Sequence, residues 1–142
     1  MATRSTIALE YANGQIDQVY CHWDGYLDHN GKILQSHYTD PFKVQKLMDL
    51  GPMSSLRDEV FSDPDDEHSF DKPQKNVCVF YGRDRNDHDM GSNRFADFHD
   101  YKKHGQFEEY DYILRTDGQW YVSDHGGEFK LLAIELASEA LV

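Results

Sequence analysis

The side chains best suited to chemistry are gathered in residues 20–26, which read Tyr-Cys-His-Trp-Asp-Gly-Tyr. An imidazole, an indole, a carboxylate, a thiol and two phenols can together stack on a ligand, hydrogen-bond to it and carry charge. The segment lies where a hairpin strand is expected to end. Because a strand alternates its side chains between two faces, we expect His22 and Asp24 on one face and Cys21 and Trp23 on the core side.

A small-ligand site is one interpretation of this segment. Arginines from a later, irregular part of the chain could hold a phosphate or carboxylate through paired hydrogen bonds, while indole and phenol rings stack on a base. Such a site would sequester a nucleotide-type signalling molecule. Its candidate residues are His22, Trp23, Asp24, Tyr26, Arg83, Arg85, Arg94, Trp120 and His125. In the alternative interpretation, the arginines neutralise neighbouring aspartates at the surface.

Common catalytic patterns are absent from the sequence. It contains no Gly-x-Ser-x-Gly nucleophile turn, no Gly-x-x-x-x-Gly-Lys-Ser/Thr phosphate loop and no Gly-x-Gly-x-x-Gly dinucleotide turn. Cys21 and His22 are adjacent, but neighbours in a strand point to opposite faces and cannot form a catalytic pair there. We therefore expect a non-catalytic protein that needs no cofactor.

Eight histidines and many aspartates raise the question of a metal site, with His22, Asp24, His29, Asp124 and His125 as candidate ligands. No His-Glu-x-x-His, Cys-x-x-Cys or His-x-x-x-His spacing supports it, and zinc or iron needs three or four converging ligands. Residues 84–91 resemble a calcium-binding loop only in composition, because their glycine and acidic residues do not follow the order of an EF-hand loop. We expect no bound metal, and a metal-dependent enzyme is the third interpretation.

The net charge of −12 is concentrated in one segment, residues 58–71, which has seven acidic residues and no Lys or Arg. A strongly acidic protein repels phosphate backbones and attracts basic surfaces, so direct nucleic-acid binding is disfavoured. The segment is either a solubilising loop or an interface for a basic, nucleic-acid-binding protein. Its acidic residues are Asp58, Glu59, Asp63, Asp65, Asp66, Glu67 and Asp71.

Length and composition indicate one soluble domain over residues 1–142. The sequence has neither an apolar run of membrane-spanning length nor the apolar region of a signal peptide, so we expect a cytoplasmic protein that does not bind membranes. Its two cysteines, Cys21 and Cys78, each lie in a strand-like apolar run. That placement favours reduced core thiols over a disulfide.

Turn chemistry predicts two β-hairpins. Residues 4–11 and 16–23 flank an Asn-Gly pair, and residues 110–115 and 120–123 flank an Asp-Gly pair. These dipeptides supply the positive φ angles of tight turns. Apolar residues at helical spacing then predict short helices, over residues 33–38, 40–51 and 130–141, with one further helical turn over residues 54–60.

The remaining chain is predicted to hold a central strand over residues 76–81, where four consecutive apolar residues occur. An acidic loop over about residues 58–75 precedes this strand, and an irregular segment over about residues 82–106 follows it. The whole predicts an α+β fold: a single domain with a mainly antiparallel sheet, built from two hairpins and a central strand, with two or three helices.

Several segments resemble a group of small proteins encoded by bacteriophages and prophages. They are the opening Met-Ala-Thr-Arg-Ser-Thr-Ile, the Tyr-Cys-His-Trp-Asp-Gly-Tyr segment, His29-Asn30-Gly31-Lys32-Ile33-Leu34, His37-Tyr38, Ser54-Ser55-Leu56, and Trp120-Tyr121-Val122-Ser123-Asp124-His125-Gly126-Gly127. The likeness covers about the first 56 residues and the second hairpin. It implies a phage accessory protein that acts in the bacterial cytoplasm. By analogy with small acidic phage proteins, including anti-CRISPR proteins, our leading hypothesis is a host-defence inhibitor that occludes a basic, nucleic-acid-binding host protein.

Overall fold

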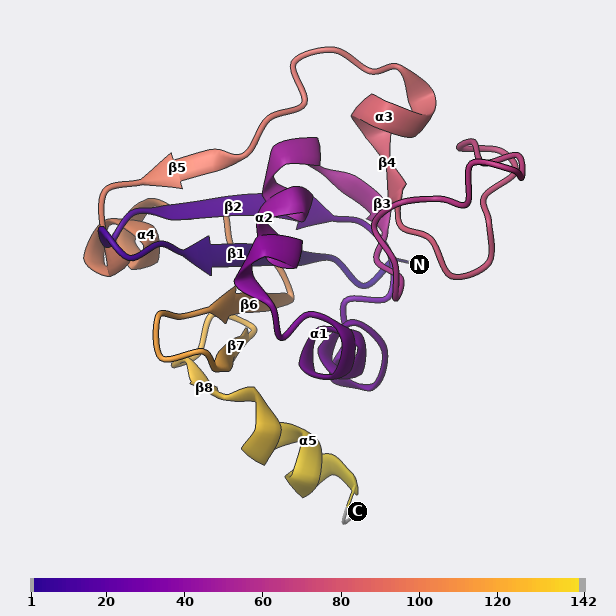
Figure 1. Cartoon of the computed structure of the whole chain (residues 1–142). Helices are drawn as coiled ribbons and strands as arrows, with labels where there is room; N and C mark the ends of the chain where they lie inside the picture. The colour runs from indigo at the N-terminus through magenta and orange to yellow at the C-terminus, as the bar shows by residue number, and fades with distance from the viewer. Residues whose placement is uncertain (1, 141–142) are drawn as a thin grey trace.

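Two hairpins joined side by side form the centre of the structure, a computed structural model that describes residues 2–140 (Figure 1). In the first hairpin β1 (Ser5–Glu10) pairs antiparallel with β2 (Ile16–Cys21), and in the second β6 (Tyr110–Leu114) pairs antiparallel with β7 (Trp120–Asp124). The hairpins meet where β1 and β6 pair in parallel. Both predicted hairpins are therefore confirmed.

Four short strands complete an eight-stranded sheet with the order β4-β3-β2-β1-β6-β7-β8, in which β5 pairs with β2. The short strands are β3 (Met53–Ser55), β4 (Val79–Phe80), β5 (Asn93–Phe95) and β8 (Lys130–Leu131). Among the strand pairs within residues 2–140, β1–β6 and β2–β3 are parallel and the others are antiparallel. The predicted α+β class with a mainly antiparallel sheet is thus confirmed.

Helices cover both faces of this sheet. Five α-helices lie in the described part of the chain, more than the two or three predicted, and a π-helical turn, η1 (Leu27–Gly31), leads into the first. They are α1 (Lys32–His37), α2 (Pro41–Leu50), α3 (Tyr81–Arg85), α4 (Phe98–His104) and α5 (Leu132–Ala140). Within residues 2–140, none of them has both the length and the apolar character that crossing a membrane requires.

The larger core lies between one sheet face and helices α1, α2 and α5. Leu34 of α1, Leu47 of α2 and Leu132 of α5 pack there with sheet residues such as Ile7 and Tyr112. A smaller core on the opposite face joins Ala8, Ile16, Phe95, Tyr101 and Ile113. Because β1 sends side chains into both cores, it is the central strand of the fold.

The local sequence explains why the first hairpin and α2 form where they do. Gly14 takes a φ of +90°, and its N–H donates to the Tyr11 carbonyl at 2.9 Å, closing the turn. At the start of α2, the Asp40 side chain accepts a hydrogen bond from the Phe42 N–H at 2.9 Å, and Pro41 occupies the first turn. This cap is the one that the sequence predicts.

Three predicted elements are wrong. The apolar run at residues 76–81 yields only the two-residue strand β4, which lies at the edge of the sheet and whose Phe80 side chain packs in the larger core. Residues 54–60 contain the end of β3 in place of a helical turn, because β3 pairs with the end of β2. Residues 82–106 are not irregular: most of α3, β5 and α4 lie there, and the last two pack on the smaller core.

Both cysteines are buried and free, as predicted. Burial raises the pKa of Cys21 to about 12 and also raises the pKa of Cys78. Since the thiolate is the reactive form, burial disfavours nucleophilic chemistry at either side chain.

A buried polar cluster links the two hairpins on the smaller-core face. The Thr6 hydroxyl donates to the Asp111 carboxylate at 2.6 Å, and the Gln18 amide donates to the Thr6 oxygen at 3.1 Å. The Glu108 N–H also donates to Asp111, at 3.1 Å. Burial raises the pKa of Asp111 to about 6, although these hydrogen bonds act in the opposite direction.

This raised pKa predicts a pH-dependent stability. Between the ordinary aspartate pKa and about 6, the folded state holds more protons than the unfolded chain, so the free energy of unfolding falls as the pH rises through that interval. Relative to Asp111→Asn, wild type should lose on the order of 2 kcal/mol between about pH 4 and about pH 7. Urea unfolding of both proteins across this range measures the difference. A constant difference would contradict the assignment to Asp111.

Candidate functional site

Residues 20–26 form a sharp corner at the end of β2. The strand ends at Cys21, and the Trp23 N–H donates to the Ser54 carbonyl of β3 at 3.0 Å. Asp24 then takes a φ of 58°, and the Gly25 N–H donates to the Thr3 carbonyl at 2.8 Å. A Cβ at residue 25 would lie 2.8 Å from that carbonyl oxygen, so only glycine fits the turn.

The rings of this corner face outward. Trp23 is 42% exposed and Tyr26 is 39% exposed. The His22 ring lies edge-on to Trp23 with 4.7 Å between centroids, and its Nδ1 is 2.7 Å from the Tyr20 hydroxyl. The expected core placement is right for Cys21 and wrong for Trp23, because the strand alternation stops where the backbone turns. We call His22, Trp23 and Tyr26 the aromatic corner.

Buried hydrogen bonds hold the aromatic corner from below. The Asn30 N–H donates to the Asp24 carbonyl at 3.2 Å, and the Asn30 side-chain amide donates to the Ser5 hydroxyl at 3.2 Å. The Tyr112 hydroxyl donates to the Gly25 carbonyl at 2.6 Å. Because two of these contacts reach successive carbonyls of the turn, at Asp24 and Gly25, the corner presents its rings from a fixed backbone.

The acidic segment forms an exposed loop between β3 and β4. Asp58 is partly exposed, and its carboxylate lies 3.6 Å from the His37 ring. The other six acidic side chains are exposed and take part in no ion pair within residues 2–140. They are Glu59, Asp63, Asp65, Asp66, Glu67 and Asp71. We call these six residues the acidic loop.

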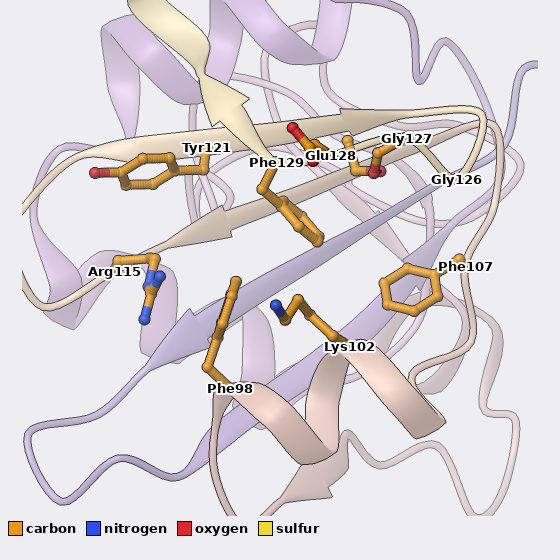
Figure 2. Close-up of a pocket in the computed structure, with 10 residues that line it drawn as sticks. Phe98, Lys102, Phe107, Arg115, Tyr121, Gly126, Gly127, Glu128 and Phe129 are labelled. Carbon is orange, nitrogen blue, oxygen red and sulfur yellow. The ribbon is translucent and has the colours of Figure 1, made fainter.

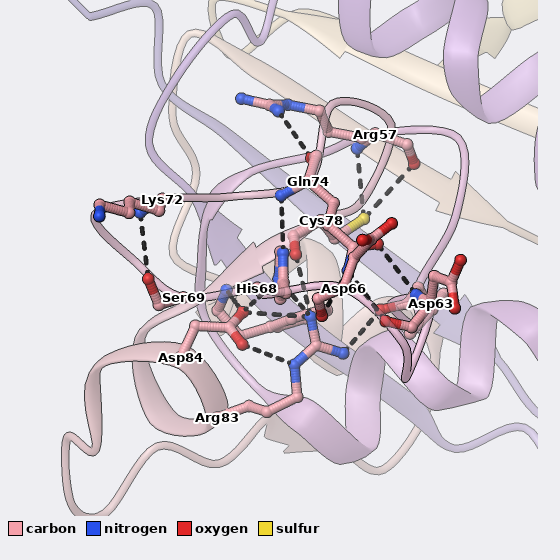
Figure 3. A network of polar contacts seen from close by, with 12 residues as sticks. Arg57, Asp63, Asp66, His68, Ser69, Lys72, Gln74, Cys78, Arg83 and Asp84 are labelled. Atoms are coloured by element: carbon pink, nitrogen blue, oxygen red, sulfur yellow. Dashed lines mark hydrogen bonds and ion pairs between the residues drawn. The ribbon is translucent and has the colours of Figure 1, made fainter.

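Arg83 anchors the acidic loop from the inside (Figure 3). Its guanidinium donates to the Val60 carbonyl at 2.6 Å, to the Cys78 carbonyl at 3.0 Å and to the Asp84 carboxylate at 2.9 Å. Asp84 lies in turn 3.4 Å from the His68 ring, and both of these side chains are only 4% exposed. His68 accepts a hydrogen bond from the Gln74 N–H at 2.9 Å, so residues on either side of the loop tip are tied together.

Gln74 fixes the tip of the same loop. Its side-chain oxygen accepts from the Asp63 N–H at 2.9 Å, and its amide nitrogen donates to the Asp63 and Asp66 carbonyls at 3.0 and 3.1 Å. The Asp63 carboxylate also accepts from the Asp65 N–H at 3.0 Å. The backbone beneath the exposed carboxylates therefore has a defined conformation.

The small-ligand site expected from the sequence does not assemble. Arg85 pairs with Asp87 at 2.6 Å and Arg94 pairs with Asp17 at 2.8 Å, so the interpretation of these arginines as partners of nearby aspartates holds. Arg83 is occupied inside the acidic loop.

The other candidate residues of the small-ligand site occupy three places: the core, the end of the second hairpin and the corner. Trp120 is 3% exposed and donates from its indole to the Tyr38 carbonyl at 2.9 Å, so it belongs to the core. His125 lies beside Asp124 at the end of the second hairpin. His22, Trp23, Asp24 and Tyr26 stay together in the corner.

A pocket that the sequence did not reveal lies between α4 and the second hairpin (Figure 2). Its volume is about 650 Å³. Aromatic and cationic side chains line it: Phe98, Lys102, Phe107, Arg115, Tyr121 and Phe129. These residues come from five separate elements and loops, so spacing along the chain gave no sign of the pocket.

No protein-family model, curated protein or solved structure matches this chain. Across residues 2–140, no group of three or more His, Cys, Asp or Glu side chains is arranged to hold a metal ion. The expected metal candidates His22, His29 and His125 each bond to a separate protein partner: Tyr20, Asn30 and Asp124.

Two arginines of α3 provide a matched test of the anchor. Arg83→Gln should leave the Asp84 carboxylate buried without its cation and destabilise the fold by about 3 kcal/mol. Arg85→Gln removes an exposed ion pair with Asp87 and the stacking of the guanidinium on Phe70 and Tyr81, and leaves no buried charge unpaired, so it should cost only about 1 kcal/mol. Hydrogen exchange of residues 58–78 should accelerate in the first variant alone. Equal protection in the two variants would show that Arg83 does not order the loop.

Proposed function

We propose that this is a non-catalytic binding protein that attaches to a basic surface of another protein and blocks it. The observation that supports the proposal is the acidic loop: six exposed carboxylates without ion-pair partners among the described residues, on a backbone that Arg83, His68 and Gln74 hold in place. A loop that only improved solubility would not need buried anchors. The sequence resemblance to phage and prophage proteins makes a bacterial host protein the partner of choice.

The charge of the acidic loop and its ordered backbone favour binding in different ways. Exposed carboxylates attract a basic surface over a distance and increase the association rate. A loop that is ordered before binding loses less conformational entropy in the complex than a flexible one. The acidic loop combines both properties, which suits a protein that must compete with nucleic acid for a basic groove.

The aromatic corner lies beside this loop and can supply the short-range contacts. Trp23 hydrogen-bonds to Ser54 of β3, and the chain enters the acidic loop soon after β3. Figure 1 shows the loop at the same end of the sheet as the end of β2. Trp and Tyr are enriched among the residues that contribute most to protein interfaces. We infer one continuous binding surface, in which carboxylates steer the partner and the rings of Trp23 and Tyr26 pack against it.

Occlusion is the mechanism that this surface supports. A defence or nucleic-acid-processing protein, such as a CRISPR effector, binds phosphates through Lys and Arg side chains. Carboxylates presented on a firm loop can pair with the same side chains, so that nucleic acid and this protein exclude each other. No step of this mechanism requires a bond to be made or broken.

Neutralising the tip of the acidic loop tests the proposal. A variant with Asp63→Asn, Asp65→Asn, Asp66→Asn and Glu67→Gln keeps the side-chain shapes and the hydrogen-bond acceptor of Asp63. It should bind the partner with an association rate about 10-fold lower at low salt, and its melting temperature should barely change. The wild-type rate should itself fall as the Debye length shrinks from about 10 Å at 0.1 M salt to about 3 Å at 1 M.

The matched control removes the same four charges elsewhere. Asp28, Asp49, Asp89 and Glu139 are exposed and lie outside the acidic loop. Their Asn and Gln replacements remove the same charge and one exposed ion pair, that of Asp28 with Lys32, which should contribute little to stability. Each immobilised protein is incubated with an extract of infected bacteria, and the captured proteins are quantified by mass spectrometry before rates are measured with the purified partner. A partner retained equally by the loop variant and the control would contradict a role for the acidic loop.

The aromatic corner gives a separate prediction. Trp23→Ala should weaken binding by on the order of 2 kcal/mol, mainly through faster dissociation, because a packed interface indole is lost. Its half-exposed position limits the effect on unfolding to about 1 kcal/mol. Phe42→Ala is the control, since Phe42 is 75% exposed on α2, away from the corner. Surface plasmon resonance compares the two, and an unchanged dissociation rate in Trp23→Ala would remove the corner from the interface.

A further inference from the structure

The pocket between α4 and the second hairpin has a rigid aromatic floor, which we call the aromatic pocket. Phe98, Phe107 and Phe129 each pack on the fully buried ring of Tyr101, with centroid distances of 5.9, 5.5 and 5.8 Å. Phe98 and Phe129 also meet edge to face at 5.8 Å. Because the buried Tyr101 ring contacts all three, their orientations do not depend on a ligand.

Two cations reach into this pocket (Figure 2). Lys102 lies over the Phe98 ring at 5.1 Å, and within residues 2–140 its ammonium has no carboxylate within 4.0 Å. The Arg115 guanidinium stacks on Phe98 at 3.7 Å, and Glu10 binds its Nε and Nη2 atoms at 3.2 and 3.1 Å. That pairing orients the guanidinium and leaves Nη1 available to an anion.

The residues that line the pocket therefore favour a ligand that is both flat and negatively charged. Phe129 and Tyr121 supply ring surfaces, and the oriented Arg115 plane is itself a surface on which a base can stack. Glu128 is the single acidic residue in the lining, against two cations, in a chain whose net charge is −12. A volume of about 650 Å³ lies within the range of about 300 to 1,000 Å³ that is typical of small-molecule sites.

We propose that the aromatic pocket binds a mononucleotide, with the base stacked on its rings and the phosphate held by Lys102 and Arg115. A ligand with an aromatic ring but no phosphate would make no ionic contact with Lys102 and Arg115. A ligand with a phosphate but no ring would not stack on the aromatic side chains. A nucleic-acid strand is a weaker candidate, because every further phosphate meets the repulsion of an acidic protein. The site shares no residue with the acidic loop or the aromatic corner, so the inference stands independently of the proposed protein partner.

Titration calorimetry with AMP, GMP, CMP and UMP tests the proposal. At least one of them should bind with one-to-one stoichiometry. Adenosine, which lacks the phosphate, and ribose 5-phosphate, which lacks the base, should each bind at least about 10-fold more weakly than the matching nucleotide. A short oligothymidine distinguishes a free nucleotide from a strand, and tighter binding of the strand than of UMP would overturn the assignment.

Neighbouring lysines of α4 provide the matched variants. Lys102→Gln should weaken nucleotide binding about 10-fold, because a charge-assisted contact to phosphate is lost. Lys103→Gln, also exposed on α4 but outside the pocket lining, should bind like wild type. Glu128→Gln should tighten binding about 2-fold by removing the negative charge that lines the pocket. All three positions are exposed, so these variants are expected to fold.

Three further outcomes of these experiments would overturn the proposal. No saturable binding of any mononucleotide up to about 1 mM overturns the proposal. So does equal weakening by Lys102→Gln and Lys103→Gln, which would indicate attraction to the helix as a whole. Amide chemical-shift changes on AMP addition should centre on residues 98–107 and 121–129. Changes centred on residues 58–71 would place the ligand elsewhere and would also overturn it.

Discussion

The parallel pairing of β1 with β6 is the contact on which the rest of the molecule depends. Each hairpin alone would expose a large part of its surface, because an isolated two-stranded hairpin is at best marginally stable in water. The pairing aligns Thr6 with Asp111, Ile7 with Tyr112 and Ala8 with Ile113. It thereby assembles one face for α1, α2 and α5 and a second face for α4.

The same register connects the sheet to both candidate sites. Tyr112 is placed so that its hydroxyl reaches the Gly25 carbonyl beneath the aromatic corner. Asp111, one residue earlier, points to the other face, where it bonds to Thr6 and to the Glu108 N–H. Glu108 follows Phe107, so the buried carboxylate holds the chain segment that delivers this ring to the aromatic pocket. A shift of one residue would exchange the two faces and dismantle both sites.

The features that could be predicted from the sequence are those set by residues close together in the chain. The turns at Gly14 and Gly118 and the cap at Asp40 depend on residues within a few positions, and these elements formed as expected. Trp23 was misplaced because the strand ends two residues before it, at a pairing with β3 that the local pattern does not encode. In the same way, the run at residues 76–81 became an edge strand because β4 pairs with a single strand of the described sheet, β3, and two of the apolar side chains in the run are buried by packing in the larger core.

The two candidate sites show most clearly that local sequence patterns do not predict contacts between distant parts of the chain. That residues 58–71 would be charged and exposed follows from composition, but their anchoring depends on Gln74 and Arg83, which lie later in the chain. The aromatic pocket joins α4, the end of β6, β7 and the turn after β7, and no sequence pattern relates these segments. Single residues were recognisable as aromatic or cationic. Which of them would meet was decided by the order of the strands.

That strand order also explains how an acidic protein can keep a cationic pocket. The acidic loop continues from β3, and the aromatic pocket lies against β7, which is four strand positions away in the sheet. At about 4.8 Å for each step, the separation is about 19 Å. This is roughly twice the Debye length of about 8 to 10 Å at physiological salt, so the field of the six carboxylates is largely screened at Lys102 and Arg115. The sheet thus separates the two proposed binding surfaces, the acidic loop for a basic partner and the aromatic pocket for an anionic ligand, within one small domain.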